Sequence, residues 1–340
     1  MKRPNFSPPG TARVAMSADY DLFSPIFKAD PFPTFAKMRA EAPIYAHHSP
    51  GGGTIWYITR YEEVTAVLKD NDHFVKDFRN TLPPGAAVPK KSSLNRLINE
   101  NMLFADPPDH TRLRALVNQA FTPRRVEQLA ERIQQITNDL LAAIAPAGKA
   151  DLIKEFALPM PVRIIAELLG IPLEDQAQVA DWSQAIISPG SRDLTYRSRK
   201  QKVRAFVDYL QQMFVWRQQQ PQDDLISALV QAEEAGERLN EAELSSMVAL
   251  LLVTGHETTV NLLGNGALAL LNHSAQLVIL RERPGLWATA VEELLRFDGP
   301  VETSTTRWVR KDFIFQGHQM QRGDVVRVVL ASANRDACQF

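Results

Sequence analysis

A long apolar segment interrupted by a short polar one constrains this chain more than any other feature. Seven apolar residues, Met247–Val253, run directly into Thr254-Gly255-His256-Glu257-Thr258-Thr259. Asn240 and Glu243 form a capping-box pattern at the start of a helix, and the helical pattern continues to about Asn272. Such a helix is roughly 48 Å long, at about 1.5 Å per residue. A helix this long and this apolar is expected to cross a whole domain and to be buried there.

The polar insertion in this helix has two interpretations. Polar groups in an apolar helix are costly unless they are paired, so the insertion is either a satisfied kink or a reaction centre. The Thr258 hydroxyl can bond the Thr254 carbonyl one turn earlier and open the helix locally. His256-Glu257 also begins the zinc-binding pattern H-E-x-x-H, but Val260 occupies the fifth position. The second imidazole is missing, and we therefore reject a metalloprotease site.

The remaining pattern predicts an α+β protein that is mostly α, with strands near both ends of the sequence. Residues 1–30 are expected to form an irregular arm, and residues 31–340 a single domain. The main predicted helices outside the central one are Phe32–Glu41, Tyr61–Lys69 and Leu286–Phe297. The predicted strands are Trp56–Arg60, Thr305–Val309, Asp312–Phe315 and Asp324–Ala331. Residues 80–91 are rich in Pro and Gly and are expected to form a loop.

Composition narrows the classes of partner. Lys and Arg total 38 against 39 Asp and Glu, giving a formal charge of −1, whereas a nucleic-acid partner favours a basic surplus. The single cysteine, Cys338, fits a reducing compartment. No uninterrupted apolar run reaches the roughly 18–20 residues of a membrane span, and no secretory signal is visible. We therefore expect a cytoplasmic protein with no nucleic-acid or membrane partner.

Two further charged patterns are ambiguous by themselves. Asp106 is a favourable N-cap with Pro107 at the first helical position, which places His110 and Arg114 on one helix face. Two cations on one face suit a dianionic partner, although spacing alone favours a solvated basic face. Glu293 and Arg296 are three residues apart on a helix, and such a surface ion pair contributes under about 1 kcal/mol.

Taken together and in this order, the motifs resemble those of the bacterial soluble cytochrome P450 family, the haem-thiolate monooxygenases. Residues 106–114 with 120–124 resemble the family's C-helix segment. Residues 254–259 resemble its oxygen-activating motif, A/G-G-x-D/E-T-T/S, with Thr254 in place of the commoner Ala or Gly. Residues 293–296 match the ExxR motif, and residues 334–336 match the segment after the sheet. The likeness runs from about residue 30 to residue 340 and implies a P450-like fold with a long central helix and small sheets.

The resemblance also implies roles for individual residues. Glu257 and Thr258 would be the acid–alcohol pair that delivers protons during oxygen activation, and Glu293 with Arg296 would form a structural ion pair. Haem b would be the cofactor, O2 and a hydrophobic small molecule the substrates, and a ferredoxin-type protein with its reductase the electron source. The expected haem-propionate partners are His110, Arg114 and Arg307. The expected substrate-pocket residues are Leu250, Val253, Thr254, Val301 and Thr305.

One expected element of the family is not found in these residues. The loop F-x-x-G-x-x-x-C-x-G, whose thiolate binds the iron, normally lies downstream of residue 340 together with the helix that follows it. Cys338 lacks the Phe and Gly residues of that loop, so we expect no metal ligand in this chain and no thiolate-ligated haem. Three interpretations remain: part of a monooxygenase, an inactive truncated product that exposes an apolar patch, or a non-catalytic helical protein that binds an apolar ligand.

Overall fold

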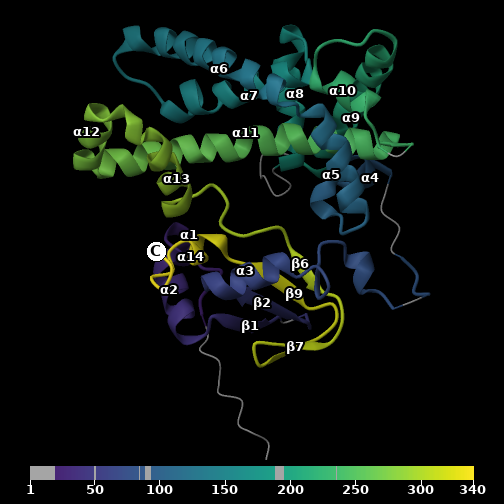
Figure 1. The fold of residues 1–340 in the computed structure, drawn as a ribbon, viewed down its shortest axis with the longest axis vertical. Coiled ribbons are helices and arrows are strands. Elements are labelled where there is room, and N and C mark those ends of the chain that lie inside the picture. The colour runs from purple at the N-terminus through teal and green to yellow at the C-terminus, as the bar shows by residue number, and fades with distance from the viewer. Residues whose placement is uncertain (1–19, 50, 84, 89–92, 188–194, 235) are drawn as a thin grey trace, which may run out of the picture.

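The computed structural model describes residues 20–49, 51–83, 85–88, 93–187, 195–234 and 236–340, and its dominant element is one central helix. This helix, α11, spans Glu241–Asn272. Both reciprocal bonds of the predicted capping box are present: the Asn240 side chain accepts from the Glu243 N–H, and Glu243 accepts from the Asn240 N–H. Figure 1 shows α11 crossing the width of the molecule between a group of helices and a sheet-containing part.

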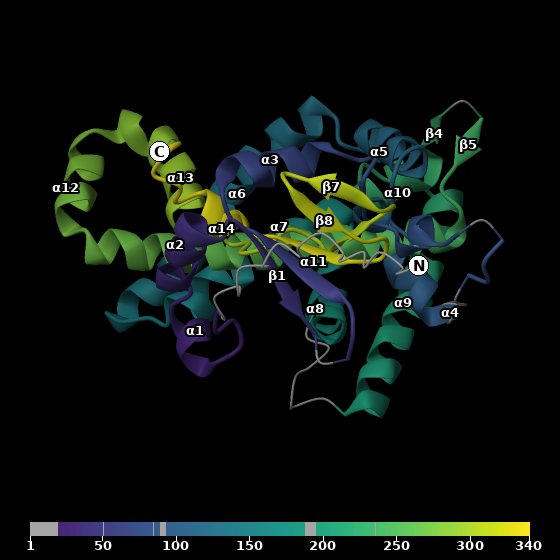
Figure 2. The same ribbon diagram turned by 90° about the horizontal axis from the view of Figure 1, so that it is seen from below.

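The helices around the first half of α11, several of them on the side away from the sheet, enclose the larger apolar core (Figure 1). Side chains from the first half of α11, including Met247 and Val248, are fully buried in this core. The second half of α11 leads into two helices at the edge of the molecule (Figures 1 and 2). The helices of this region are α4 (Ser93–Asn99), α5 (Asp109–Ala120), α6 (Pro123–Ile144), α7 (Pro159–Leu169), α8 (Leu173–Ile187), α9 (Tyr196–Gln219), α10 (Leu225–Gln231), α12 (Ser274–Glu282) and α13 (Trp287–Phe297).

A five-stranded sheet on the other side joins the two ends of the sequence. Its order is β1-β2-β9-β6-β3, and β2 pairs with β9 in parallel while the other neighbours are antiparallel. The strands are β1 (Ile44–His48), β2 (Thr54–Ile58), β3 (Phe74–Val75), β6 (Arg307–Val309) and β9 (Val325–Val328). Two small hairpins pair β4 (Glu233–Glu234) with β5 (Glu237–Arg238) and β7 (Phe313–Phe315) with β8 (His318–Met320).

The sequence predicted most of these elements and misplaced some boundaries. The helices predicted at Phe32–Glu41 and Tyr61–Lys69 are α2 and α3 with the same limits. The strand predicted at Asp324–Ala331 was too long, because β9 ends at Val328 and Leu330–Ala333 form a short helix, α14. Pairing with β2 defines this strand over Val325–Val328, and strand composition alone gives no such limit.

Part of the predicted N-terminal arm is ordered. Residues 1–19 lie outside the described range, but Pro25–Ala29 form a short helix, α1, which begins at a Ser24 cap. Tyr20 and Leu22 are buried in an aromatic-rich cluster with Phe35 and Tyr45. The prediction of irregular structure was therefore wrong for Pro25–Ala29, since apolar side chains beside the arm hold it on the domain.

Among the described residues, one helix is long and apolar enough to cross a membrane by length and composition, namely α11. A bent pair formed by residues 153–169 and 173–183 passes the same test only if it is counted as a single span. The core helix of a globular fold also meets this criterion, and α11 packs against α4, α7 and α13.

Candidate functional site

The polar insertion of α11 is a stretch in which side chains repeatedly bond the helix backbone. The Thr254 hydroxyl donates to the Leu250 carbonyl at 2.8 Å, and the Thr258 hydroxyl donates to the Thr254 carbonyl at 2.9 Å. His256 Nδ1 donates to the Leu252 carbonyl at 2.6 Å. The predicted Thr258–Thr254 bond is confirmed, and each such bond competes with the helix ladder and favours local bending, although the segment stays α-helical.

The side chains of this stretch point in different directions. Thr254 and Glu257 are exposed and Thr258 is half-buried, whereas His256 is only 3% exposed. Gly255 lies against α7, since a Cβ added there would be 3.0 Å from Ile165 Cδ1. The helix therefore turns Glu257, Thr254 and Thr258 to one side and the His256 imidazole into the packed helices on the other. Gly255 is exposed but passes close to Ile165.

A second polar group forms where the sheet meets α5. The antiparallel register pairs Val75 with Trp308, so the next pair in the same register is Lys76 and Arg307. Arg307 is 6% exposed, and its guanidinium donates to the Ser304 hydroxyl at 3.1 Å. Two cations from segments more than two hundred residues apart thus lie side by side at the end of two short strands.

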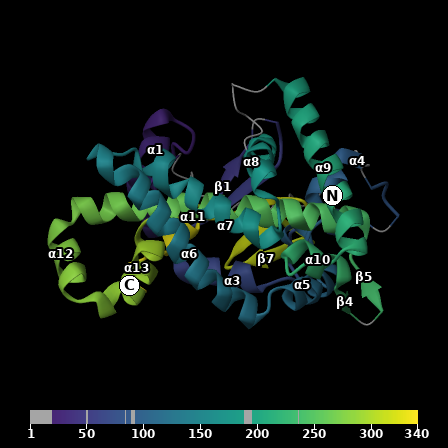
Figure 3. The same cartoon turned by 90° about the horizontal axis from the view of Figure 1, so that it is seen from above.

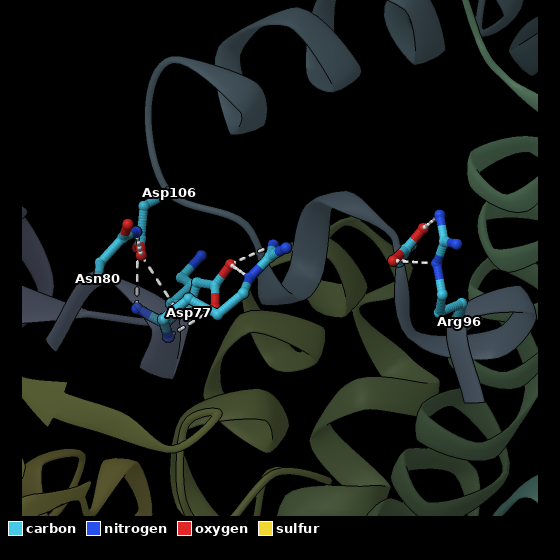
Figure 4. Close-up of polar contacts among 7 residues, drawn as sticks. Asp77, Asn80, Arg96 and Asp106 are labelled. Carbon is cyan, nitrogen blue, oxygen red and sulfur yellow. Dashed lines mark hydrogen bonds and ion pairs between the residues drawn. The ribbon is translucent and has the colours of Figure 1, made fainter. Parts of the chain in front are cut away.

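Asp106 connects α5 to this strand end. Its carboxylate accepts from the backbone N–H of Lys76 at 2.8 Å and of Asp77 at 3.0 Å, and from Asn80 Nδ2 at 2.8 Å (Figure 4). The prediction that Asp106 caps the helix was wrong, because α5 begins at Asp109 after Pro108. The Asp106 side chain instead bonds the N–H groups that end β3, and the Asp106 carbonyl accepts from the His110 N–H at 3.0 Å.

Lys76, His110, Arg114 and Arg307 are called here the cation cluster, and charges within it affect the pKa values of His110 and Lys76. Burial lowers the pKa of His110, and the charges of Lys76 and Arg114 lower it further. Burial also lowers the pKa of Lys76, with a further contribution from Arg307. The pKa of Arg307 is lowered by burial. Asp106 is the acid that opposes these shifts at His110, Lys76 and Arg307.

Two other arginines near α5 are neutralised by acids. Arg112 pairs with Glu243, which also caps α11, and with Glu237 at 3.2 Å. Arg125 pairs with Asp223 at 3.0 Å. Among the described residues, Arg114 and Arg307 form no such ion pair. The exposed side of α5 is therefore not a uniformly solvated basic face. Arg112 is paired with acids, whereas His110 and Arg114 belong to a group in which cationic side chains outnumber carboxylates.

The donor set of the cation cluster fits a dianionic ligand. Four cationic or protonatable side chains are opposed by one carboxylate, which already accepts three hydrogen bonds. Partly buried cations without carboxylate partners favour binding of carboxylates or phosphates. The two propionates of haem have this chemistry. Sequence reasoning had identified three of the four residues and missed Lys76, because only the β3–β6 register places it beside Arg307.

The predicted Glu293–Arg296 ion pair is present on α13. Arg296 Nε donates to Glu293 Oε2 at 2.7 Å, and a second guanidinium nitrogen donates to the Asn334 carbonyl at 2.6 Å. Arg335 next donates to the Phe297 carbonyl at 2.6 Å and stacks on the Phe32 ring. The pair thus attaches α13 to the segment after α14, which is a contact that the ion-pair spacing alone does not reveal.

The five predicted substrate-pocket residues lie in two places. Leu250 belongs to the main apolar core, Val253 is half-buried and Thr254 is exposed on α11. Val301 and Thr305 belong to the segment between α13 and β6, where Val301 is 42% exposed. Their grouping into one substrate pocket stays a prediction.

The single cysteine is not preorganised as a metal ligand. Cys338 is exposed, and its N–H donates to Asp336 Oδ1 at 3.1 Å. Among the described residues, no group of three or more His, Cys, Asp or Glu side chains could hold a metal ion.

Comparison with known sequences gives one consistent family. A sequence profile described as Cytochrome P450 matches residues 28–276. The polyketide biosynthesis cytochrome P450 PksS of Bacillus subtilis is 44% identical over 316 residues, covering 91% of this chain and 77% of PksS. The cytochrome P450 monooxygenase PikC of Streptomyces venezuelae is 41% identical over 335 residues, covering 97% of this chain and 78% of PikC.

Solved structures agree with the sequence matches. The PksS structure matches with a TM-score of 0.85 at 42% identity and covers 93% of this chain and 79% of that chain. P450BioI, solved in complex with an acyl carrier protein ligated to hexadec-9Z-enoic acid, matches with a TM-score of 0.81 at 36% identity. That match covers 93% of this chain and 80% of that one. The mostly helical fold expected from the sequence is confirmed.

Proposed function

Because this chain belongs to the cytochrome P450 family, we propose that the cation cluster and the polar stretch of α11 are two sides of one monooxygenase active site. The family binds haem and carries out haem-dependent monooxygenation, in which one oxygen atom of O2 enters a substrate. Hydrophobic substrates and redox partners are general features of its bacterial members. The observation that carries the proposal is the cation cluster, whose charge excess suits two propionates.

In this proposal the cation cluster anchors the cofactor. Arg307, Lys76 and His110 are partly buried, so an anion that reaches them exchanges water for charge-assisted hydrogen bonds. Arg114 is more exposed and adds charge at the outer side of α5. The bound haem would supply the redox chemistry of oxygen activation, whereas these side chains hold it in place and offset its two negative charges.

Glu257 and Thr258 would act as the proton relay. Thr258 Oγ1 donates its own hydrogen to the Thr254 carbonyl, so its lone pairs can accept a hydrogen bond from a water or ligand beside the helix. Glu257 is exposed and can exchange protons with water. Proton transfer by a positioned side chain typically accelerates a step by about 10²–10⁴-fold. Thr254, where the family commonly has Ala or Gly, adds a methyl group and a hydroxyl beside this relay.

Cys338 does not fit the role of thiolate ligand in this proposal. Its exposure and its position beside Asp336 supply none of the positive surroundings that stabilise a thiolate. A carbon monoxide difference spectrum reports thiolate ligation of haem, and we expect Cys338→Ala to give the same spectrum as the parent protein. We also expect Cys338→Ala to leave haem binding unchanged.

The anchoring role is tested by haem titration of the purified protein, followed by absorbance. Arg307→Ala should weaken haem binding by about tenfold or more, because it removes a buried charge-assisted contact. Arg310→Ala, three residues along the chain and exposed, is the matched control and should have no effect. Haem dimethyl ester lacks the propionate charges and should bind the parent protein and Arg307→Ala equally. If the parent protein and Arg307→Ala preferred haem over its ester by the same factor in affinity, anchoring by Arg307 would be ruled out.

The relay role is tested in a haem-loaded preparation supplied with an electron-donor system. Glu257→Gln should lower turnover by about 100-fold, within the range for a lost proton donor. Thr258→Ala should divert reducing equivalents from product to peroxide, while Thr258→Ser should restore most of the product yield. Unchanged product per electron in Thr258→Ala would remove this residue from the relay. Substrate binding without any electron-dependent product would favour the alternative of an apolar-ligand-binding protein.

The finer assignments complete the proposal. We propose a ferredoxin-type donor with its reductase, because no flavin or nicotinamide fingerprint is apparent in this chain, and we propose a cytoplasmic location. The substrate would be a hydrophobic small molecule held near Val253, Val301 and Thr305. Two of the matched proteins, PksS and P450BioI, are described with polyketide biosynthesis and with an acyl carrier protein respectively. Long apolar acyl or polyketide chains are accordingly the first substrates to test.

A further inference from the structure

An apolar cavity lies on the side of α11 opposite the proposed active site. Its volume is about 300 Å³, and its lining residues come from α7, α8, α11 and the segment before α7. These three helices lie side by side in Figure 3. Most of its lining is apolar, and Leu158, Val162, Ala166, Val179 and Leu252 contribute to it. Lys154, Gln176 and Asp181 also line the cavity, and Asp181 is paired with Lys202 at 2.7 Å.

His256 gives this cavity a directed polar group. The imidazole is 3% exposed and lines the cavity. Because the Leu252 carbonyl can only accept, Nδ1 carries the hydrogen of their 2.6 Å bond, and Nε2 of the neutral ring is then an acceptor. Within the part of the chain that the structure describes, Nε2 forms no hydrogen bond. The Ser183 hydroxyl, also at the cavity, already donates to the Ala180 carbonyl at 2.8 Å.

The two faces of α11 separate this cavity from the oxygen-activation residues. At about 100° per residue, His256 lies about 200° around the helix from Thr254 and Thr258 lies another 200° further, which returns it to the Thr254 side. Gly255 also packs against Ile165 of α7. A molecule in the cavity therefore does not occupy the space beside Glu257 and Thr258.

We propose that this cavity is a second ligand site, which takes a small one- or two-ring apolar molecule with a single hydroxyl or N–H group that donates to His256 Nε2. The apolar walls bind the rings through the hydrophobic effect, and the imidazole fixes their orientation. An acceptor at the cavity wall without a protein donor gains a hydrogen bond when such a ligand enters, whereas an apolar analogue leaves it unpaired. The site is distinct from the proposed substrate pocket and does not depend on haem.

A matched pair of probes tests the proposal on the purified protein. 2-Naphthol carries the hydroxyl donor, and naphthalene has the same two rings without it. By calorimetric titration we expect 2-naphthol to bind about fivefold more tightly than naphthalene, which is the typical net effect of one hydrogen bond. In His256→Phe the difference between the two probes should disappear. A preference for 2-naphthol that survives in His256→Phe would overturn the assignment of the acceptor.

Two further measurements place the probe. Ala180→Leu fills the cavity and should weaken both probes at least tenfold, whereas Thr254→Val, on the opposite face, should leave their affinities unchanged. The reverse pattern would assign the probes to the active-site face and contradict the proposal. Independently of any variant, the ¹⁵N resonance of His256 Nε2 in the unmodified protein should shift with 2-naphthol and not with naphthalene. Absence of that shift at saturating 2-naphthol would also contradict it.

Discussion

His110 takes its electrostatic character from side chains that lie far away in the sequence. Its spacing from Arg114 is visible in the sequence, but the effect of Lys76 depends on the β3–β6 pairing and on the Asp106 contacts that join α5 to the strand end. Burial and two neighbouring cations lower its pKa from the ordinary value of 6.5. The neighbours of His110 thus determine whether its imidazole is a solvated surface group or part of an anion site.

The lowered pKa of His110 predicts a pH dependence of folding stability. At pH values between the pKa of His110 in the folded protein and its pKa in the unfolded chain, the unfolded chain binds more protons. The free energy of unfolding therefore falls as the pH decreases through the unfolded-chain pKa of about 6.5. His110→Gln removes this contribution. Urea unfolding at pH 7.5 and 5.5 should therefore show a smaller loss of stability in His110→Gln than in the parent protein.

A second variant tests whether the charge of Lys76 causes part of this pH dependence. Lys76→Met removes one of the charges that lower the His110 pKa, and the loss of stability between the two pH values should shrink in it as well. An identical loss in the parent protein and in His110→Gln would show that this imidazole does not couple to folding.

Two neighbouring acids before α10 show how packing between helices determines how much a charged side chain contributes to stability. Asp224 caps α10 by accepting from the Ser227 N–H at 2.7 Å, and it pairs with Arg217 of α9 at 2.5 Å. These two side chains are only 5% and 2% exposed. Asp223, one residue earlier, pairs with Arg125 but is 81% exposed. The two acids are adjacent and chemically identical, yet only Asp224 joins two buried elements.

Replacing these two acids should therefore have different effects. Asp224→Ala leaves a buried guanidinium without its partner and removes a cap, and we expect a loss of about 3–5 kcal/mol. Asp223→Ala breaks an exposed pair and should cost under about 1 kcal/mol. Urea unfolding of the two variants measures the difference directly. Similar losses for both would mean that burial of the Arg217 pair does not determine its contribution.

At the scale of the whole molecule, the second half of α11 and the two helices after it carry a large apolar surface. These helices extend from the rest of the molecule in Figures 1 and 2. Leu271 is 69% exposed and Val291 is 42% exposed. The other exposed apolar side chains of these helices include Leu268, Val278, Ile279, Trp287 and Leu295. Apolar patches of this kind promote association in water.

We therefore expect the 340-residue protein to self-associate through these helices. The double variant Leu271→Lys with Val291→Lys should raise the concentration at which association begins by at least about tenfold, since burial of even one aliphatic side chain contributes about 1.5–3 kcal/mol and about 1.4 kcal/mol corresponds to a factor of ten. Ile314→Lys, at an exposed position on β7 (68% exposed), is the control and should not change association. Sedimentation velocity over a range of concentrations gives the comparison. Equal association of the double variant and the control would exclude this surface.

Local rules account for what the sequence determined. Asn240 and Glu243 define the start of α11 through contacts between near neighbours, and the Thr258–Thr254 bond links residues one turn apart. The Glu293–Arg296 pair likewise depends on helical spacing. The ordered set of motifs was enough to predict the family and its mostly helical fold. Helix periodicity, capping and i to i+4 contacts are encoded within a few residues, so they can be read from the chain.

Tertiary structure decided the features that depend on distant pairing. Lys76 meets Arg307 only because β3 pairs with β6, and Asp106 bonds the end of β3 instead of capping α5. Strand ends shifted because the partner strand, and not composition, sets the length of a ladder. The orientation of His256 into a cavity between α7 and α8 also arises from how separate helices pack. Register and interhelical packing join residues across long stretches of chain, and no local pattern specifies which of them will meet.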